Sequence, residues 1–401
     1  MAKRRGNREG TIYQDKDGRW RAAIDLGIVN GRRKRKVLSD ATRREVADKL
    51  ARALRDQQEG ALVTDERQTV RQYIAHWLET CKDMVRPATY DSYEYMTRIW
   101  IVPRLGHLRL AKLSAQHVQA FITEINGTDI SPKTVRHIHG TLRAALNHAV
   151  RLGVIRQNVA LLVDLPKARR YLVQPWTAEQ IGQFLAAARG DRFEAAYYVA
   201  LGAGLREGEI LGMTWSLVDL DGGTARVTQK VERVRGHGLR LSRPKGDAGE
   251  ATVTLPAIVV QKLRTHRTTQ MRERLMAGGT WPGEAELRRR LVEDQALPEQ
   301  YRADLIFTSR AGTAVDPVKL YRRFQAIREA AGLPPHRFHD LRHDHASFML
   351  SLGVSLKEIQ ASLRHSQIGL TADTYTHLLA AVSAANAAKM DGLLRGAAGE
   401  A

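Results

Sequence analysis

The stretch of sequence that decides the fold consists of His-Asp-Leu-Arg-His (residues 339–343), Leu-Arg-His-Ser (363–366) and Asp-Thr-Tyr-Thr-His (373–377). A mostly apolar segment with a helical pattern joins the first motif to the second. Among their residues are two histidines, His339 and His365, an arginine, Arg342, and a tyrosine, Tyr375, within a short span of chain. Such a set of side chains can bind, polarise and attack a phosphodiester without a metal ion.

Two motifs farther upstream complete the pattern. Arg206 lies in Gly-Leu-Arg-Glu-Gly-Glu (204–209), and Lys245 lies in Pro-Lys-Gly (244–246). In order and spacing, these motifs resemble the signature of the tyrosine recombinases, the phage-integrase family, over the last half of the chain. The matching residues are Arg206, Lys245, His339, Arg342, His365 and Tyr375. One departure is visible, because relatives usually carry Leu-Gly-His where this chain has Leu363-Arg364-His365. This arginine adds charge near the scissile phosphate and bears on the local backbone geometry, but it removes no catalytic group.

The resemblance implies a division of roles among these side chains. Tyr375 would attack the scissile phosphate and leave a 3′-phosphotyrosyl link and a free 5′ hydroxyl, which then attacks the partner duplex. Because an unperturbed tyrosine has a pKa of about 10, the attack needs a base or nearby cations that favour the phenolate. Arg206 and Arg342 would bind the nonbridging oxygens. His339 would exchange the proton of the attacking or departing oxygen, and His365 would hydrogen-bond a nonbridging oxygen.

Lys245 and Glu209 complete the implied site. Lys245, on a predicted β-turn, would protonate the departing 5′ oxygen, as its counterpart does in the family. Glu209 falls three residues after Arg206, on the same predicted helical face, and is interpreted as the orienting partner of that arginine. Taken singly, an Arg-x-x-Glu pair is usually a surface ion pair, and a tyrosine near a carboxy terminus usually belongs to a core. The joint occurrence of all six groups in this order favours the site.

Metal and nucleotide sites are weaker interpretations of the same region. His339 and His343 are four residues apart, which is metal-ligand spacing, and His336 and His345 lie close by. Cysteine ligands are absent there and no Asp or Glu completes an obvious set, so no metal is expected. Gly202-Ala203-Gly204 lacks the Gly-Lys-Ser/Thr ending of a phosphate-binding loop, and the joined bonds need no nucleotide energy. We therefore expect no cofactor.

Length and charge favour a DNA-binding protein of two or three domains. At 401 residues the chain exceeds the usual size of one domain. Its 63 Lys and Arg against 43 Asp and Glu give a net charge of +20, which attracts polyanions. Ribosome-associated and membrane-surface proteins can be equally basic, so charge alone does not decide. There is no long apolar run or secretory signal, and the single cysteine, Cys81, cannot form an internal disulfide. We expect a DNA-associated protein of the reducing bacterial cytoplasm.

The first predicted domain, residues 1–65, combines a small sheet with a helix. Residues 20–26 alternate as in a half-buried strand, and Asn30-Gly31 favours a hairpin turn before five consecutive basic residues. Thr42 and Glu45 predict the cap of a helix that covers the sheet. By pattern alone the segment resembles the arm-site DNA-binding domain of some phage integrases, whose cations would hold phosphates beside a groove. The candidate contacts are Arg19, Arg21, Arg33 and Arg35. The alternative is a solvated loop or a nonspecific charge patch.

The second predicted domain, residues 66–170, is a four-helix bundle. Apolar periodicity marks the helices, with caps expected at Ser114 and Ser131. Trp77 and Trp100 are expected in the core rather than stacked on bases. Cations on the fourth helix form a solvated face by default, but the resemblance implies that this bundle grips the core DNA site. The candidate contacts are Lys133, Arg136 and Arg143.

The third predicted domain, residues 171–401, is a catalytic domain with a C-terminal tail, entered through a basic linker. A helix opens it, short β segments follow near 225–227 and 252–254, and helices then return. Residues 277–302 show no clear core pattern and are expected to form an insertion or mobile loop. The amphipathic segment after Tyr375 would dock on a neighbouring protomer or pack on its own domain.

The predicted fold class is mainly α with small β-sheets: a sheet-plus-helix domain, a four-helix bundle and a mixed α/β tyrosine-recombinase catalytic domain. The resemblance implies a site-specific recombinase of phages or mobile elements, acting as a homo-tetramer on double-stranded attachment sites. A host DNA-bending protein and a directionality factor are compatible further partners. The alternatives are a Xer-like or transposon-type recombinase, a type IB topoisomerase, and a DNA-binding regulator that has lost catalysis. The amino-terminal module disfavours a resolvase or topoisomerase, and the presence of all six active groups disfavours the regulator.

Overall fold

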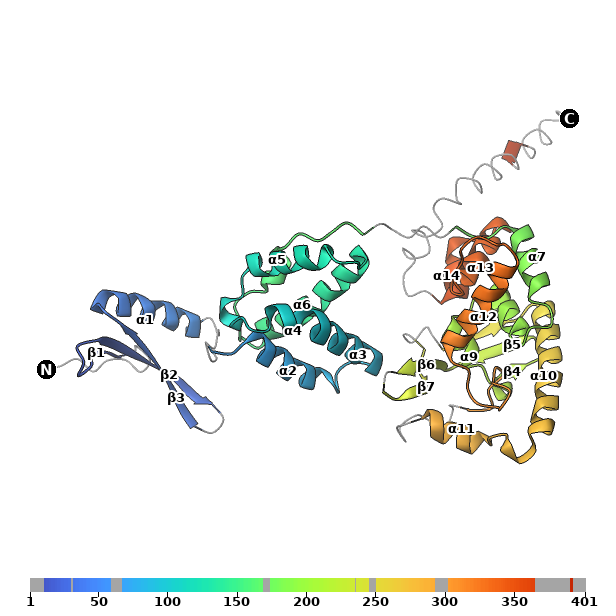
Figure 1. Ribbon diagram of the computed structural model, residues 1–401, viewed down its shortest axis with the longest axis horizontal. Coiled ribbons are helices and arrows are strands. Elements are labelled where there is room, and N and C mark those ends of the chain that lie inside the picture. The colour runs from blue at the N-terminus through green and yellow to red at the C-terminus, as the bar shows by residue number, and fades with distance from the viewer. Residues whose placement is uncertain are drawn as a thin grey trace. The chain divides into compact units, whose positions relative to one another are not determined.

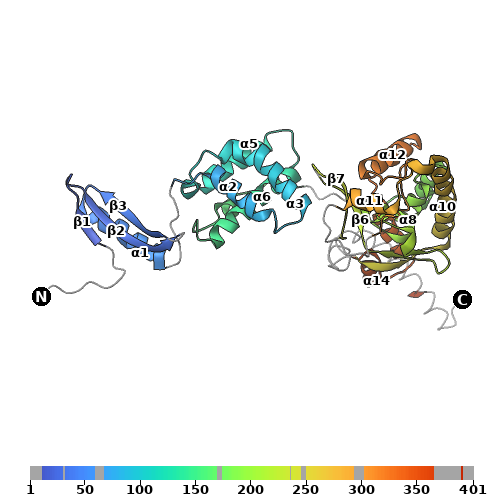
Figure 2. The same cartoon turned by 90° about the horizontal axis from the view of Figure 1, so that it is seen from below.

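The computed structural model describes residues 11–29, 32–58, 67–168, 174–234, 236–244, 250–292, 302–364 and 390–391. The chain divides between Arg170 and Tyr171 into two compact units, each of which is considered by itself. Their elements can be followed in Figure 1 and Figure 2. Within the described ranges, no helix is long and apolar enough to cross a membrane.

A three-stranded antiparallel sheet comes first, and one helix packs along it (Figure 1). The elements are β1 (Thr11–Gln14), β2 (Trp20–Val29), β3 (Arg32–Asp40) and α1 (Arg43–Gln58), with strand order β1-β2-β3. Ala22 and Ile24 of β2 are buried together with Val46 and Leu50 of α1. The alternation predicted for this strand is therefore confirmed, and its apolar face is closed by the helix.

The strand β3 contains the basic run that follows the predicted turn. Asn30-Gly31, the turn itself, lies outside the described residues. The register between β2 and β3 shifts between Asp25 and Ile28, which marks a β-bulge. The predicted cap of α1 is confirmed: the Glu45 N–H donates to Thr42 Oγ1 at 3.3 Å, and the Thr42 N–H donates to Glu45 Oε2 at 3.1 Å.

The rest of the first unit is helical, as predicted. Its α-helices are α2 (Val70–Cys81), α3 (Pro87–Met96), α4 (Val102–Leu105), α5 (Ala115–Asn126) and α6 (Pro132–Arg151). The π-helical turn η1 (Thr97–Ile101) joins α3 to α4, and two 3-10 turns are η2 (Leu110–Lys112) and η3 (Val159–Leu162). Ser114 and Ser131 cap α5 and α6 through their side chains. Trp77 and Cys81 are buried, and Trp100 is partly buried against the same core, so both tryptophans are core residues.

The second unit is a helical domain with two small antiparallel sheets. Its α-helices are α7 (Ala178–Ala187), α8 (Glu194–Ala203), α9 (Glu207–Leu211), α10 (Ala257–Ala277), α11 (Glu284–Leu291), α12 (Pro317–Ala330), α13 (Asp340–Ser351) and α14 (Leu356–Leu363). The 3-10 turns are η4 (Trp215–Leu217) and η6 (Gly278–Thr280). One sheet has the order β4-β5-β8, formed by β4 (Val218–Asp219), β5 (Thr224–Val227) and β8 (Ala251–Thr254). The other is the hairpin of β6 (Lys230–Val234) and β7 (Gly238–Ser242). The predicted β segments are confirmed as β5 and β8, whereas the hairpin was not anticipated.

The prediction of a loop over residues 277–302 is wrong in its first half. There α11 folds onto the domain and buries Leu287 and Leu291. Just before it, Trp281 packs so closely on Gly312 that an added Cβ would lie 2.6 Å from the indole ring. Two leucines among glutamates and arginines make too short a pattern to indicate a buried face. Residues 293–301 lie outside the described residues.

An aromatic cluster supports the helix that begins the candidate site. The rings of Phe184, Tyr197, Phe324 and Phe338 pack with centroids 5.1 to 6.2 Å apart. These residues come from α7, α8, α12 and the segment just before α13. Since Phe338 directly precedes His339, the core fixes the position from which α13 starts.

Candidate active site

Arg206 and Glu209 meet at the first turn of α9. The chain leaves α8 through Gly204, which has a φ of 60° and packs so closely on the His345 ring that an added Cβ would lie 2.7 Å from it. Arg206 is the extended N-cap residue and not part of the helix, which corrects the expectation of a shared helical face. The contact with Glu209 forms nevertheless. Arg206 Nη1 donates to Glu209 Oε1 at 2.8 Å, and the Arg206 N–H donates to Oε2 at 3.0 Å.

The side chain of Arg364 reaches the same carboxylate from the end of α14. Its Nη2 donates to Glu209 Oε2, and the side chains of Arg364 and Glu209 are only 4% and 2% exposed. Burial alone would raise the pKa of Glu209, but the charge of Arg364, followed by the hydrogen bonds and charge of Arg206, lowers it below its ordinary value. Glu209 is therefore ionised and binds two guanidinium groups at once.

The backbone of Arg364 is also unusual. It is left-handed, with φ 52° and ψ 47°, and is the only non-glycine residue with positive φ in the part of the chain that the structure describes. This conformation ends α14, and the Arg364 N–H donates to the Ala361 carbonyl at 3.0 Å. A left-handed backbone costs a residue with a Cβ about 1–2 kcal/mol. The departure from Leu-Gly-His thus places an arginine at a helix end that favours glycine.

Arg342 ties the ends of three helices together. Its side chain is buried, and Nη1 donates to the carbonyl of Gly204 while Nη2 donates to the carbonyl of Leu363. Gly204 ends α8 two residues before Arg206, and Leu363 is the last residue of α14, next to Arg364. Hydrogen bonds from a charged donor to buried carbonyls are strong. The arginine of α13 therefore fixes the backbone that carries the two other arginines.

His339 lies at the start of α13, where it meets the ring of His343 edge to face at a centroid distance of 5.4 Å. Its side chain reaches solvent at the edge of the site, yet the protein that surrounds the rest of the ring lowers its pKa, and the charges of Arg342 and Arg206 lower it further. Burial and the neighbouring His339 lower the pKa of His343 to about 4. His339 is therefore a neutral imidazole at pH 7, and a neutral imidazole can accept a proton.

A second set of contacts anchors α13 to the beginning of the unit. Asp344 is fully buried, and its two oxygens bind His336 Nε2 at 2.8 Å and the Trp176 N–H at 3.0 Å. The His336 and Trp176 rings stack with centroids 4.1 Å apart. Asp340 accepts hydrogen bonds from Arg337, the nearest at 2.6 Å. These contacts hold the helix rigidly, so the positions of His339 and Arg342 depend on the whole fold.

Three of the predicted catalytic residues, Lys245, His365 and Tyr375, lie outside the described residues, as does the predicted tail apart from Met390 and Asp391. The structure brings the other three and Glu209 together around the ends of α8, α13 and α14. The sequence shows that Arg364 stands where relatives have glycine, but no contact was predicted for it. Its partner Glu209 is 155 residues away in the chain, so this contact follows only from the tertiary fold. No group of three potential metal ligands occurs within the described ranges.

The predicted DNA contacts of the first sheet lie on its surface. Arg19 and Arg35 are exposed. The side chain of Arg21 is 39% exposed and forms an ion pair with Asp15 at 2.5 Å. The side chain of Arg33 lies outside the described residues, although its backbone in β3 pairs with Ile28 of β2.

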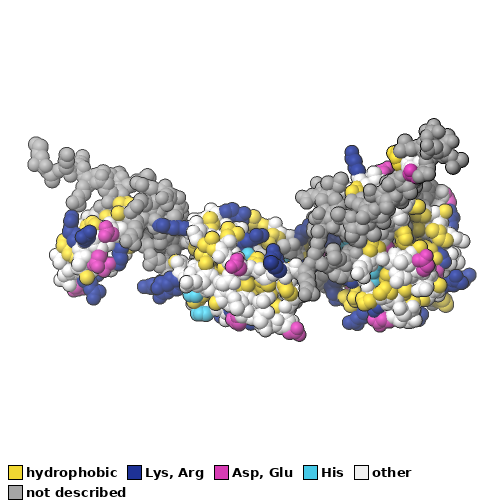
Figure 3. All heavy atoms as spheres, turned by 90° about the horizontal axis from the view of Figure 1, so that it is seen from above, with side chains coloured by type: hydrophobic (Ala, Val, Ile, Leu, Met, Phe, Trp, Pro, Cys, Tyr) yellow, Lys and Arg dark blue, Asp and Glu magenta, His cyan; other side chains and the backbone are white. Residues whose placement is uncertain are grey.

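The predicted contacts on α6 are exposed as well. Lys133, Arg136 and Arg143 all face solvent, and Arg136 Nη1 donates to the Pro166 carbonyl at 3.3 Å. Figure 3 shows Lys and Arg side chains on the visible surface of both units, with Asp and Glu side chains among them. Exposure alone is compatible both with DNA contact and with an ordinary solvated face.

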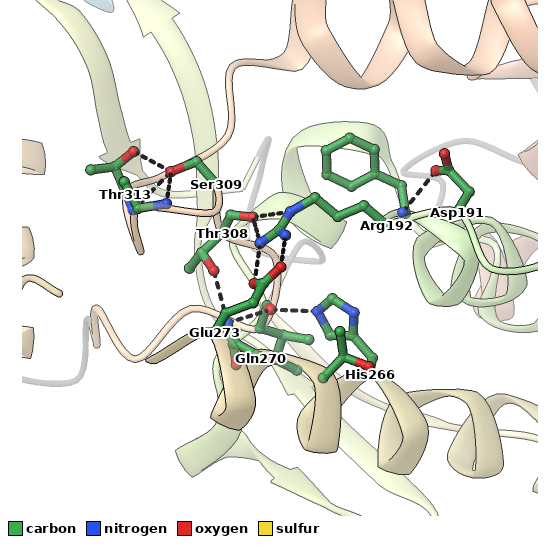
Figure 4. Close-up of polar contacts among 12 residues, drawn as sticks. Asp191, Arg192, His266, Gln270, Glu273, Thr308, Ser309 and Thr313 are labelled. Atoms are coloured by element: carbon green, nitrogen blue, oxygen red, sulfur yellow. Dashed lines mark hydrogen bonds and ion pairs between the residues drawn. The ribbon is translucent and has the colours of Figure 1, made fainter. Parts of the chain in front are cut away.

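A separate polar network in the second unit has a different character (Figure 4). Arg192 Nη2 donates to Glu273 Oε2 at 2.8 Å, and Arg192 Nε donates to the Thr308 carbonyl at 2.9 Å. Gln270 Nε2 donates to the carbonyls of residues 305 and 306 at 3.0 and 2.9 Å. The network thus satisfies the backbone of an irregular segment that packs on α10, which is a structural role.

Models of known protein families match both units of the chain. The model of the Phage integrase family matches residues 175–381, about half of the chain, and a model of the phage integrase N-terminal SAM-like domain matches residues 69–126. The first match includes all six predicted catalytic positions. The chain therefore belongs to the phage integrase family of tyrosine recombinases, enzymes that cut and rejoin DNA through a tyrosine intermediate.

Relatives that match along nearly their whole length carry integrase or recombinase names. The chain is 28% identical over 408 residues to an integrase of Streptomyces ambofaciens, covering 98% of this chain and 99% of the relative. It is 27% identical over 387 residues to a putative prophage phiRv2 integrase of Mycobacterium tuberculosis, covering 92% and 91%. It is 26% identical over 377 residues to a XerC-like tyrosine recombinase of Caldanaerobacter subterraneus, covering 90% and 92%.

Solved structures share the fold. The Tn1549 transposon integrase in complex with a circular intermediate DNA superposes with a TM-score of 0.65 at 21% identity, covering 77% of this chain and 95% of that one. A lambda integrase dimer bound to a COC′ core site gives 0.54 at 16% identity, covering 93% and 96%. The predicted fold class, mainly helical with small sheets, is confirmed.

Proposed function

We propose that this protein is a site-specific integrase that inserts and excises a phage or mobile element at attachment sites in double-stranded DNA. The observation that carries the proposal is the convergence of Arg206, His339 and Arg342 at the ends of α8, α13 and α14, in a chain of the phage integrase family. The positive charges of Arg206 and Arg342, gathered at one place beside the neutral His339, suit a phosphate in its transition state.

The proposed reaction exchanges one phosphate ester for another. Tyr375 Oη attacks the scissile phosphorus, and the bond from phosphorus to the 5′ oxygen of the next sugar breaks. The products are a 3′-phosphotyrosyl link and a 5′ hydroxyl, which takes the proton released overall by the tyrosine. Attack by the 5′ hydroxyl of a partner duplex on the link reverses the step and frees Tyr375. The bond energy is retained throughout, so the cycle consumes no nucleotide.

The described residues would each serve this reaction in a different way. Arg206, whose side chain is 29% exposed, offers its guanidinium to a nonbridging oxygen, with Glu209 as its orienting partner. Arg342 adds buried positive charge and rigidity at the same place. His339, neutral because its surroundings lower its pKa, accepts the proton of the attacking oxygen. In the proposed scheme Lys245 protonates the departing 5′ oxygen and His365 binds a nonbridging oxygen.

The DNA partner and the assembly follow from the same proposal. The Tn1549 and lambda integrases were solved on DNA, which supports a duplex partner for this protein. Two attachment sites that exchange strands need four active sites, so we propose a homo-tetramer on DNA, with a host DNA-bending protein and a directionality factor as further partners. The proposed division is an arm-site domain over 1–65, a core-binding domain over 66–170 and a catalytic domain over 171–401.

A Xer-like recombinase is the second candidate, because one relative is named XerC-like. The sheet of β1, β2 and β3 with its covering helix supports the integrase instead, since a module in front of the helical bundle suits a protein that reads additional DNA sites. Deleting residues 1–60 should leave binding to the core site intact and prevent integration. Unchanged recombination by the truncated protein would favour the Xer-like alternative.

The full-length protein and the DNA that flanks its own gene provide the decisive test. A nicked suicide substrate lets the short 5′-hydroxyl fragment diffuse away, so that the covalent complex accumulates. We expect wild type to form a protein–DNA adduct whose 3′ ends map to defined positions, and Tyr375→Phe to bind the same DNA without an adduct. An adduct on Tyr375→Phe would assign the nucleophile elsewhere, and a wild type without any adduct would reject the proposal.

A further inference from the structure

We propose that Arg364 is a positioning residue for strand cleavage, which holds Arg206 through Glu209 and presents the Leu363 carbonyl to Arg342. The inference rests on the proposed function, because its readout is DNA cleavage. It goes beyond that function by giving a role to the position where this chain departs from the Leu-Gly-His pattern.

The first step is the sharing of one carboxylate. Glu209 Oε1 accepts from Arg206 Nη1 at 2.8 Å, and Oε2 accepts from Arg364 Nη2 and from the Arg206 N–H. Both oxygens are therefore bound, and the plane of the carboxylate is fixed from two sides. A guanidinium is a planar fork, so the orientation of Glu209 sets the orientation of Arg206. Without Arg364, one carboxylate oxygen would keep only a backbone donor and Glu209 would hold Arg206 less firmly.

The second step is the backbone of Arg364. Its left-handed conformation ends α14 directly after Leu363, whose carbonyl accepts from Arg342 Nη2. Glycine would adopt this backbone at a lower energetic cost. The buried ion pair with Glu209 is a contact that glycine cannot make. Arg364 thus binds Glu209, the partner of Arg206, with its side chain, and it directly follows Leu363, whose carbonyl binds Arg342.

The third step concerns charge and its response to pH. Within the part of the chain that the structure describes, Arg206 and Arg364 are the charged groups that face Glu209. On neighbouring elements, Lys230 of β6 pairs with Glu232, and the charge of Asp316 at the start of α12 acts on Glu207. Burial alone would raise the pKa of Glu209. Removing Arg364 should therefore bring protonation of Glu209 closer to neutral pH. A protonated Glu209 releases its ion pair with Arg206, so cleavage should then fall at a higher pH than in wild type.

The test uses full-length protein on the nicked substrate whose cleavage point the previous experiment maps. Arg364→Gly removes the side chain and relaxes the turn, whereas Arg364→Ala removes the side chain and keeps the left-handed strain. We expect both to cleave about 10- to 100-fold more slowly at pH 7 with unchanged DNA binding, since contacting members of an ion-pair network couple on this scale. In both variants the fall of the cleavage rate at acidic pH, the acidic limb of the pH–rate profile, should move to higher pH. Arg364→Lys, which keeps a positive charge, should restore part of the rate.

Two controls separate positioning from folding. In a Glu209→Gln background, Arg364→Gly should cause little additional loss, because the same contact is already broken. Arg328→Ala removes another nearly buried arginine, whose Nη1 binds the Leu333 carbonyl at 2.9 Å, and should lower stability without moving the acidic limb. If Arg364→Gly keeps the wild-type rate and pH profile, the inference is overturned while the proposed function stands. If wild type itself forms no adduct, the proposed function fails first.

Discussion

Two arginine–glutamate pairs in the second unit show how similar contacts serve different ends. Arg192 binds Glu273 with both terminal nitrogens and the Thr308 carbonyl with Nε and Nη2, so the whole guanidinium is used by the protein (Figure 4). Arg206 binds Glu209 through Nη1, and Glu209 is the only described residue that binds its guanidinium. The protein thus binds every nitrogen of the Arg192 guanidinium, whereas Arg206 keeps guanidinium nitrogens that no described residue binds, which suits the proposed phosphate contact.

The charges that surround the two pairs also differ. The Arg192 pair adjoins Gln270, whose amide binds the carbonyls of residues 305 and 306 and accepts from Trp215 Nε1 at 2.7 Å. The further members of this network are therefore neutral side chains and backbone carbonyls. The Arg206 pair adjoins two further arginines, of which Arg364 shares the Glu209 carboxylate and Arg342 binds nearby carbonyls. An accumulation of positive charge near a surface indicates a site for an anion, while a balanced network indicates packing.

The largest difference should appear when each arginine is removed. Arg206→Ala should slow cleavage of the nicked substrate about 10²- to 10³-fold, the usual effect of losing one donor to a transition-state oxyanion, with little change in stability. Arg192→Ala should instead lower the free energy of unfolding by about 2–4 kcal/mol, because it leaves a partly buried Glu273 and a carbonyl without their donor. Single-turnover cleavage and urea unfolding measure the two effects. If the folded Arg192→Ala protein cleaves as slowly as Arg206→Ala, the distinction between the pairs is lost.

Local patterns predicted much of this molecule because they depend on neighbours in sequence. The alternation from Trp20 to Ile24, the caps at Thr42, Ser114 and Ser131, and the His-x-x-Arg spacing at the start of α13 are all of this kind. The contacts that were missed join distant segments. Glu209 and Arg364 are 155 residues apart, and no periodicity in either segment indicates the other. The roles of Lys245, His365 and Tyr375 stay predictions.

The hairpin and α11 were missed for a related reason. The strands β6 and β7 are short, and their buried residues Val231, Val234 and Leu241 stand among charged and polar neighbours. The helix α11 buries two leucines among three arginines and two glutamates. In both cases the apolar signal is one or two residues long, and burial comes from the partner that covers them. Tertiary contacts decide such elements, whereas the longer helices carry enough repeats to be recognised.

A medium effect is expected from Gln270, which belongs to the balanced network. Gln270→Ala removes the side-chain donor of the Leu305 carbonyl, one of two donors to the Ile306 carbonyl, and the acceptor of the Trp215 indole, so the free energy of unfolding should fall by about 1–3 kcal/mol. Gln261→Ala on the same helix provides the matched control, because Gln261 is exposed and should change stability by less than about 0.5 kcal/mol. Cleavage by the folded Gln270→Ala protein should equal wild type. Equal stability of the two variants would show that the Leu305 carbonyl and the Trp215 indole find other partners.

The smallest effect concerns a partly buried histidine in each region. Burial lowers the pKa of His266, whose Nε2 lies 2.9 Å from the Ile306 carbonyl, and lowers that of His343 to about 4. An unfolded histidine titrates at about 6.5, so the unfolded state binds more protons below that pH, down to about pH 4 for His343, and stability falls as the pH drops. Replacing His343 by Asn should flatten the fall by about 1–2 kcal/mol, and replacing His266 by Asn should flatten it in the same direction, both measured by urea unfolding at several pH values. Only His343→Asn should also alter the acidic limb of cleavage, because His343 contacts His339. If His343→Asn keeps the wild-type slope of stability, the ring is not held neutral by burial. If it leaves the dependence of cleavage on pH unchanged, the histidines do not distinguish the two clusters.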